Sequence, residues 1–362
     1  MASRSPSLLA SCLFDQAACW ASLCRRRSDM TFLRTHRTLA TVIAFVLAYV
    51  VIKLLSILPL VDGGPLLNGY YIQLIALVGI NIVMTVSLGM VNGFTGQFSI
   101  GHAGFMAVGA YTSAMITTVW LHTSTANPWV AYPVFIVAIL TGGLLAAAAG
   151  YLVGAPSLRL KGDYLAIVTL SANELIRTVI RVTEVLGGPR GLGGIPKLTT
   201  LEVVFVFAIV SVVLMRNYLF SSYGRSMKAV RDSEIAAESM AINTTRQKVF
   251  VFVFSAFFAG VSGGVFAHLL QFIHPDNFSF VKSLEYLIYL YVGGSTSISG
   301  AMVGPAIFTF LPELMRGLQS WRLVIYPLIL IFVMIFRTEG IMGLKEFGFI
   351  LIPQRQRKEV SA

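Results

Sequence analysis

The sequence predicts an all-α integral membrane protein, and three observations lead to that prediction. The chain has 362 residues, of which 56% are hydrophobic and only 12% are charged, against roughly 25% charged residues in an ordinary soluble domain. The mean hydropathy is +0.78, so the apolar residues exceed what one water-soluble core could bury. These residues fall in long runs separated by short polar segments, which is typical of helices that cross a bilayer.

We expect about ten transmembrane helices, because a spanning helix needs about 20 mostly apolar residues. The clear apolar runs cover residues 39–60, 69–91, 103–121, 130–153, 201–216, 249–271 and 322–337. A weaker run at 163–182 carries Glu174 and Arg177, which are three residues apart and can pair on one helix face. Two short pieces, 284–294 and 300–316, are separated by GGSTSISG. Some of the expected helices are therefore short or interrupted by glycine.

The basic residues predict which side of the membrane each loop faces, because cytoplasmic loops carry the excess of Lys and Arg. Most of the 27 basic residues lie before residue 38, in the loops at 155–162 and 217–248, or after residue 336. The opposite loops hold only Arg181, Arg190, Lys197, Lys282, Arg316 and Arg322.

Both termini are therefore expected in the cytoplasm. The predicted organisation is a disordered tail over 1–38, a transmembrane domain over 39–343 and a second cytoplasmic tail over 344–362. The tail at 1–38 also contains Met30, which is an alternative start of the chain.

Two glycine-rich breaks are the first candidate functional segments. Residues 93–111, GFTGQFSIGHAGFMAVGAY, place five glycines where a membrane helix is expected. Irregular backbone at membrane depth must line a cavity or be buried in protein, so this break predicts either a polar passage or close helix packing through small residues. Residues 292–306, VGGSTSISGAMVGPA, form a second break, and paired breaks in corresponding halves point to a transport site near the midplane. The passage candidates are Gly96, Gln97, Ser99, Gly101, His102, Ser297, Ser299 and Gly300.

Two loops complete the candidates. The outer loop LGGPRGLGGIP, residues 186–196, predicts a gate, a docking surface for an external protein or a plain flexible loop, with Gly188, Pro189, Arg190 and Gly191 at its centre. The cytoplasmic segment 224–248 alternates basic and acidic residues and should be largely helical, with a helix restarting at Asn243-Thr244-Thr245. This segment suits docking on a soluble partner, although a merely solvated loop has the same composition.

Enzymatic chemistry has no candidate residues in the chain. There is no HExxH motif and no GxxxxGK[ST] phosphate loop. The three cysteines all lie within the first 24 residues, at Cys12, Cys19 and Cys24. The spans hold few acidic residues, whereas proton or sodium coupling usually needs more. We therefore expect no enzyme activity, no cofactor and no metal, with energy supplied by a separate ATPase.

Taken together, these segments resemble the branched-chain amino acid permease family of ABC importers, in its LivM-type subunit, from about Leu39 to Gly343. The matching segments are GQFSIGHAGFMAVGAY, LRLKGDYLAIVTL followed by NELIR, GGPRGLGGIP, VRDSEIAAESMAIN, AFFAGVSGGVFA, VGGSTSISGAMVGPA and FRTEGIMG. The resemblance implies a permease in the bacterial cytoplasmic membrane that passes branched-chain or related amino acids. The implied partners are a second, LivH-like permease subunit, two ATP-binding subunits, an extracytoplasmic binding protein and the lipid bilayer, but no nucleic acid.

The resemblance also implies a role for the cytoplasmic loop. The short helix that docks on the ATPase in this family corresponds to residues 228–243. ATPase coupling is therefore expected of Arg231, Glu234, Ala236, Ala237, Glu238 and Ala241. The family usually has Gly where this chain has Ala241, and that departure puts the turn after the docking helix in doubt.

Three alternatives remain open from the sequence. Urea and amide importers are built on a similar plan and resemble the same segments. A secondary transporter would work without the ATPase, and a purely structural membrane subunit would show no substrate-dependent phenotype.

Overall fold

The computed structural model describes residues 68–121, 128–158 and 163–321, together with single positions between 42 and 53 and between 325 and 343. Residues 1–50 and 347–362 form one unit, and residues 51–346 form the other. The tails predicted at 1–38 and 344–362, and most of the runs at 39–60 and 322–337, lie outside the described residues.

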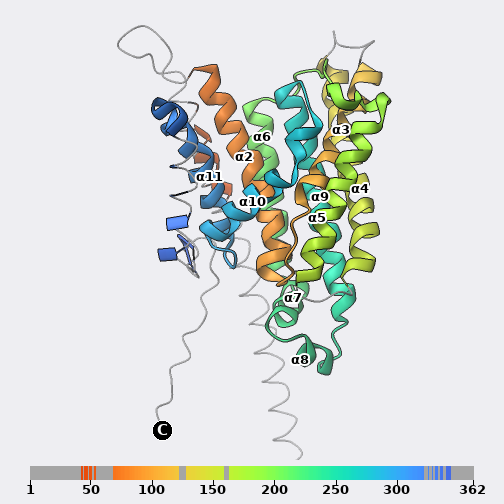
Figure 1. Cartoon of the computed structure of the whole chain (residues 1–362), viewed down its shortest axis with the longest axis vertical. Coiled ribbons are helices and arrows are strands. Elements are labelled where there is room, and N and C mark those ends of the chain that lie inside the picture. The colour runs from red at the N-terminus through yellow and green to blue at the C-terminus, as the bar shows by residue number, and fades with distance from the viewer. Residues whose placement is uncertain are drawn as a thin grey trace, which may run out of the picture. The chain divides into compact units, whose positions relative to one another are not determined.

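Every apolar run that falls in the described ranges is a helix (Figure 1). The helices of these runs are α2 Gly69–Gly89, α3 His102–Leu121, α4 Pro128–Ser157, α5 Asp163–Val182, α6 Leu201–Leu219, α9 Thr244–Leu270, α10 Phe280–Gly293 and α11 Ile298–Leu314. Four stretches within the described residues are long and apolar enough to cross a membrane, namely Gly69–Phe94, Trp129–Ser157, α6 and α9. The described part of the chain is therefore helical, as predicted.

Short helices occupy the connections between these elements. The segment predicted to be cytoplasmic contains α7 Ser222–Asp232 and α8 Glu234–Ser239. A π-helix, η1 Met90–Phe94, continues α2. Single 3-10 turns are η2 Glu184–Leu186, η3 Gly188–Arg190, η4 Pro275–Phe278 and η5 Arg316–Trp321.

Helices α3, α4 and α9 pack closely through glycine. A Cβ on Gly109 of α3 would lie 2.0 Å from the carbonyl oxygen of Gly260 in α9, and a Cβ on Gly142 of α4 would lie 2.8 Å from the carbonyl oxygen of Gly109. Only glycine fits such contacts, which allow the helix backbones to touch. The prediction that Gly104 and Gly109 interrupt a helix is wrong, because both lie inside the regular helix α3.

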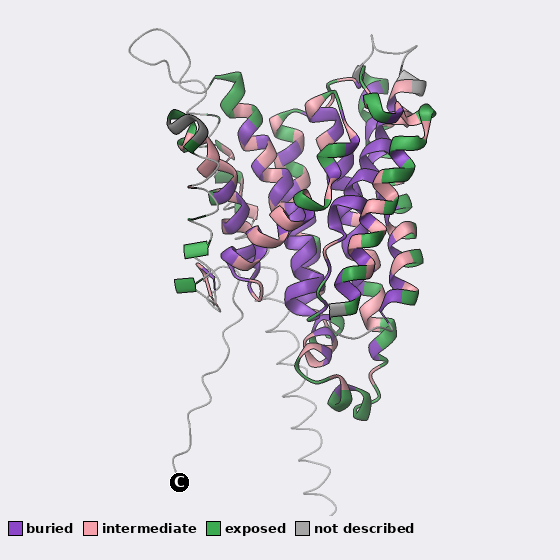
Figure 2. Ribbon diagram, viewed as in Figure 1, coloured by how far each residue is buried: buried purple, intermediate pink, exposed green. Residues whose placement is uncertain are grey.

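The lateral surface of α4 is apolar and exposed. Leu144 and Leu145 are more than half exposed, and so are Tyr151 and Leu152 further along the helix. Figure 2 shows the exposed and half-buried positions along α4, while α9 behind it is largely buried. Such a surface suits contact with lipid, where exposed apolar side chains carry no penalty.

Candidate functional site

Within the first glycine break, residues 93–101 comprise the end of η1 and an irregular segment before α3. Residues 96–101 are not helical, and Gly96 has a φ of +72°, which favours glycine. The side chain of Asn92 holds this segment by two hydrogen bonds to the backbone of Ser99, donating to its carbonyl oxygen at 3.1 Å and accepting from its N–H at 3.2 Å. The break is thus a defined structure that returns along the end of α2.

Buried polar atoms without a hydrogen-bond partner gather along this break. Within the described residues, neither amide atom of Gln97 is paired, although the residue is only 5% exposed. The hydroxyl of Ser99 and the Nδ1 atom of His102 are also buried and unpaired. Buried polar groups are normally satisfied, because an unpaired one is costly. These atoms could therefore bind water, a polar solute or a neighbouring subunit.

The other ring nitrogen of His102 serves packing. Its Nε2 atom lies 3.0 Å from Ser87 Oγ and 3.2 Å from Ser255 Oγ, and Ser255 donates to the carbonyl oxygen of Ser87 at 2.6 Å. This network joins α2, α3 and α9. One nitrogen of the imidazole thus has a structural role, because it holds these three helices together.

The structure brings the two glycine breaks together. A Cβ on Gly93 would lie 1.7 Å from the carbonyl oxygen of Ser295, so the first break touches the second directly. The segment after Gly340 also joins here, because the N–H groups of Ile341 and Met342 donate to the carbonyl oxygens of Val292 and Gly293. Sequence reasoning quoted this segment only for its resemblance and missed its position.

Several passage candidates have structural contacts instead. Ser297 is the N-cap of α11, and its Oγ accepts from the N–H of Gly300 at 2.8 Å. A Cβ on Gly300 would lie 2.4 Å from the carbonyl oxygen of Gly293, and one on Gly101 would lie 2.5 Å from that of Thr169. Ser299 is fully buried in the first turn of α11.

The segment predicted to be cytoplasmic is helical, and its predicted cap at Asn243 is present. Ser233 caps α8, and Asn243 caps α9 by accepting from the N–H of Arg246 at 2.9 Å. Arg231 in α7 contacts the first break, because its Nη1 donates to the carbonyl oxygen of Gly93 at 3.5 Å. A Cβ on Gly96 would lie 3.0 Å from Arg231 Cγ. Movement of this segment would therefore act directly on the break.

The carboxylates predicted for ATPase coupling each have a partner within the chain. Glu234 pairs with Lys248 at 2.8 Å, and Glu238 accepts from Thr244 Oγ1 at 2.8 Å. Ala237 is buried, whereas the large apolar side chains of Ile235 and Met240 are 79% and 77% exposed. The exposed surface around α8 thus contains large apolar side chains beside the charged ones.

The turn that follows α8 contains a strained alanine. Ala241 has a φ of +58°, in the left-handed region that favours glycine. Its N–H donates to the carbonyl oxygen of Glu238, and the N–H of Ile242 donates to that of Ala237. These two hydrogen bonds form a Schellman motif. The departure at Ala241 therefore falls where glycine would be preferred.

The loop at residues 186–196, predicted to face outward, is paired with the segment that follows α9. Leu192 and Ile273 exchange backbone hydrogen bonds of 2.9 and 3.0 Å. His274 Nε2 lies 2.9 Å from the carbonyl oxygen of Pro189. Gly191 has a φ of +78°, and a Cβ there would lie 2.6 Å from the carbonyl oxygen of Ile273. Gly188 is buried, and the adjacent Arg190 is exposed.

An ionic cluster lies beside this outer pairing. The predicted Glu174–Arg177 pair is confirmed at 2.9 Å, and Arg177 also pairs with Asp276 of η4. Arg181 contacts the same carboxylate at 2.5 Å. The hydrogen bond from Arg177 is the main cause that holds the pKa of Asp276 below its ordinary value. The sequence predicted only the local pair, because Asp276 lies about a hundred residues further along the chain.

The apolar helices long enough to cross a membrane, joined through the two glycine breaks, indicate the class of a multi-pass membrane protein. The chain matches the family described as "Branched-chain amino acid transport system / permease component" over residues 70–336. It therefore belongs to this family.

Individual relatives agree with the family match. The chain is 30% identical over 306 residues to the high-affinity branched-chain amino acid transport system permease protein LivM of Escherichia coli (strain K12), covering 75% of this chain and 69% of the relative. It is 31% identical over 298 residues to LivM of Salmonella typhimurium, covering 73% and 68%. It is also 23% identical over 288 residues to the permease protein LivH of Salmonella typhimurium, covering 73% and 91%. No solved structure matches the chain.

Proposed function

We propose that this chain is one permease subunit of an ATP-driven importer for branched-chain amino acids. The names of the LivM and LivH relatives support this substrate class. The proposed assembly contains a LivH-like permease, two ATP-binding subunits and a binding protein that delivers the amino acid. The proposed topology is about ten spans in the cytoplasmic membrane, with both termini inside.

The contact between Arg231 and the first glycine break carries the mechanistic part of the proposal. An ATP-binding subunit docked on α8 would move α7 with it, because only Ser233 separates the two helices. Arg231 would then pull on the backbone around Gly93, which itself touches Ser295 in the second break. Both breaks would respond to one movement, and the passage would open to alternate sides.

The proposed passage uses the unpaired polar atoms of the first break. Gln97, Ser99 and His102 Nδ1 offer hydrogen-bonding groups without a fixed charge. Such weak contacts suit a permease whose selectivity resides in the delivering protein. The tight packing at Gly101 and Gly300 gives these residues the separate role of holding the breaks in place.

Uptake assays test the substrate. Labelled leucine and labelled urea are supplied to cells that contain the partner subunits, with and without this chain. Leucine uptake that needs both the chain and ATP is the expected result. Uptake of urea in place of leucine would contradict the proposed substrate class. Leucine uptake without the ATP-binding subunits would contradict the ATP-driven mechanism.

The docking surface is tested at the exposed tip of α8. Charge reversal at Glu234 or Glu238 would break their contacts within the chain, so the clean change is Ile235→Asp, at a side chain that is 79% exposed. We expect this variant to lose the ATP-binding subunits on purification and to lose uptake. Ser222→Asp adds the same charge to α7 away from α8 and is the matched control. Normal retention of the ATPase by Ile235→Asp would rule out docking at this position.

Cysteine accessibility tests the passage. Ser99→Cys and Ser299→Cys are made in a chain without Cys12, Cys19 and Cys24, with Ser262→Cys in the packed part of α9 as a buried control. We expect labelling of the Ser99 variant to depend on the nucleotide state, with the Ser262 variant protected throughout. Complete protection of Ser99→Cys and Ser299→Cys in every nucleotide state would contradict the passage.

A further inference from the structure

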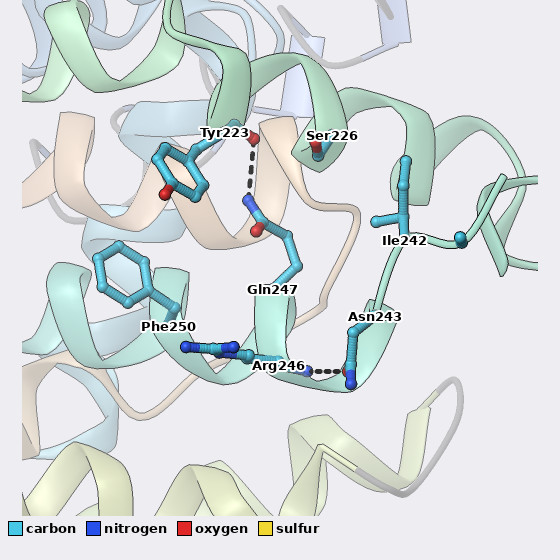
Figure 3. Close-up of a pocket in the computed structure, with 8 residues that line it drawn as sticks. Tyr223, Ser226, Ile242, Asn243, Arg246, Gln247 and Phe250 are labelled. Carbon is cyan, nitrogen blue, oxygen red and sulfur yellow. Dashed lines mark hydrogen bonds between the residues drawn. The ribbon is translucent and has the colours of Figure 1, made fainter.

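A groove of about 560 Å³ lies where α7, the turn after α8 and the start of α9 meet. Figure 3 shows Tyr223 and Ser226 of α7 on one side and Asn243, Arg246, Gln247 and Phe250 of α9 on the other. Gln247 closes the inner end, because its Nε2 donates to the carbonyl oxygen of Tyr223 at 2.9 Å and to the hydroxyl of Tyr218 at 3.3 Å. The groove is therefore formed by specific hydrogen bonds at this junction, and none of its lining residues belongs to the proposed passage.

The length of α9 places the groove at the level of the lipid headgroups. The helix has 27 residues, which corresponds to about 40 Å at 1.5 Å per residue, whereas the hydrocarbon core is only about 30 Å thick. The apolar part of the helix begins after Lys248. Its first turn, which carries Arg246, must therefore project beyond the hydrocarbon.

Aromatic rings mark the same level. Tyr218 at the end of α6 stacks on Tyr223 with centroids 6.5 Å apart and on Phe250 with centroids 5.7 Å apart. Tyr223 and Phe250 are both more than half exposed. Aromatic residues with a polar edge are enriched where the membrane meets water. Phe250 also supplies an apolar wall on the membrane side of the groove.

The polar lining of the groove suits a phosphate group. Arg246 is exposed, and among the described residues its guanidinium has no ion-pair or hydrogen-bond partner. The nearby acids Glu234 and Glu238 are engaged with Lys248 and Thr244. None of the residues that line the groove is acidic. A guanidinium is well matched to phosphate oxygens, and basic pockets at this level of a membrane protein suit anionic headgroups.

We propose that this groove binds the headgroup phosphate of an anionic lipid. Arg246 contacts the phosphate oxygens, Asn243 donates from its side-chain amide, and the acyl chains lie along Phe250 toward the hydrocarbon. Because α7, the turn after α8 and the start of α9 all border the groove, the bound lipid would brace the junction between this segment and the membrane. The proposal depends on the membrane level of α9 and not on which substrate the permease carries.

Native mass spectrometry of the assembled permease complex tests the proposal. The complex is reconstituted in phosphatidylcholine vesicles with a minor fraction of phosphatidylglycerol and then released for counting of retained lipids. Arg246→Gln should lower phosphatidylglycerol retention about fivefold, as expected for the loss of one basic contact near the surface. Arg246→Lys should restore part of it. Arg225→Gln, at an exposed arginine of α7 outside the groove, should retain the wild-type level.

Three results would overturn the proposal. The first is equal phosphatidylglycerol retention by the wild type and Arg246→Gln in complexes that assemble equally well. The second is an equal loss in Arg225→Gln, which would indicate diffuse attraction by surface charge. The third is displacement of the lipid by inorganic phosphate at the same concentration, which would make the groove a site for the free anion.

Discussion

Replacing Ala241 with glycine should stabilise the turn between α8 and α9. An L-residue in the left-handed region costs roughly 1–2 kcal/mol relative to its ordinary conformation, and Ala241 has a φ of +58°. Glycine avoids that cost but loses about 0.5–1 kcal/mol more backbone entropy on folding. The difference predicts a net stabilisation of about 0.5–1 kcal/mol for Ala241→Gly.

Amide hydrogen exchange at the turn measures this difference locally. The relevant groups are the N–H groups of residues 241 and 242, which close the Schellman motif onto the carbonyl oxygens of Glu238 and Ala237. A stabilisation of about 0.5–1 kcal/mol corresponds to a roughly two- to fivefold increase in their protection, after correction for intrinsic exchange rates. The permease is measured in its membrane-reconstituted complex.

Ala236→Gly is the matched control, because it makes the same chemical change inside α8. Ala236 lies in the helix rather than in the left-handed turn, so glycine there should cost about 1 kcal/mol and lower protection. The two variants must therefore shift protection in opposite directions. Reduced protection in Ala241→Gly would refute the argument that the alanine is strained.

Two further predictions concern packing and the outer cluster. Gly109→Ala should destabilise the permease by about 1–3 kcal/mol or prevent its assembly, because the new Cβ would meet the carbonyl oxygen of Gly260 at 2.0 Å. Gly69→Ala, with no atom within 4 Å of its new Cβ, is the control and should not lower the thermal unfolding temperature. An equal loss of stability in both variants would contradict the packing argument. The pKa of Asp276 is lowered in the folded state chiefly by Arg177. The ion pairs of Asp276 therefore stabilise the folded state above its ordinary pKa of 3.8, and this stabilisation is lost as the pH falls through the lower folded-state pKa. The amide protection of Leu192 and Ile273 against hydrogen exchange should therefore stay constant down to about pH 5 and decrease only in stronger acid. Asp276→Asn should decrease this protection at neutral pH and abolish its further decrease in acid. Unchanged protection in Asp276→Asn would show that the cluster does not support the outer pairing.

Local patterns in the sequence predicted the helices and the cap at Asn243. Apolar runs located every helix of the described spans, because the bilayer forces the backbone of such runs to pair within itself. The Glu174–Arg177 pair and the Asn243 cap were also predictable, since each depends on residues three apart in one helix. The resemblance of short segments further identified the family, which the match over residues 70–336 confirms.

Other features depend on how distant helices pack. The sequence does not distinguish the roles of the glycines at positions 93, 96, 101 and 300. In the structure, Gly96 adopts a left-handed conformation, whereas the other three allow backbone segments to touch. The sequence presents Glu234 and Glu238 as a charged docking face, yet each has a partner in the same chain, Lys248 and Thr244 respectively.

The sequence alone thus indicated that the described part of the chain is helical, where its apolar helices lie and to which family the chain belongs, because these properties follow from local composition and short motifs. Only the tertiary structure placed Gly93 against Ser295, Arg231 against the first break and Asp276 between two arginines. Each of these contacts joins residues about one to two hundred positions apart, so it is set by the packing of whole helices, which no local pattern encodes.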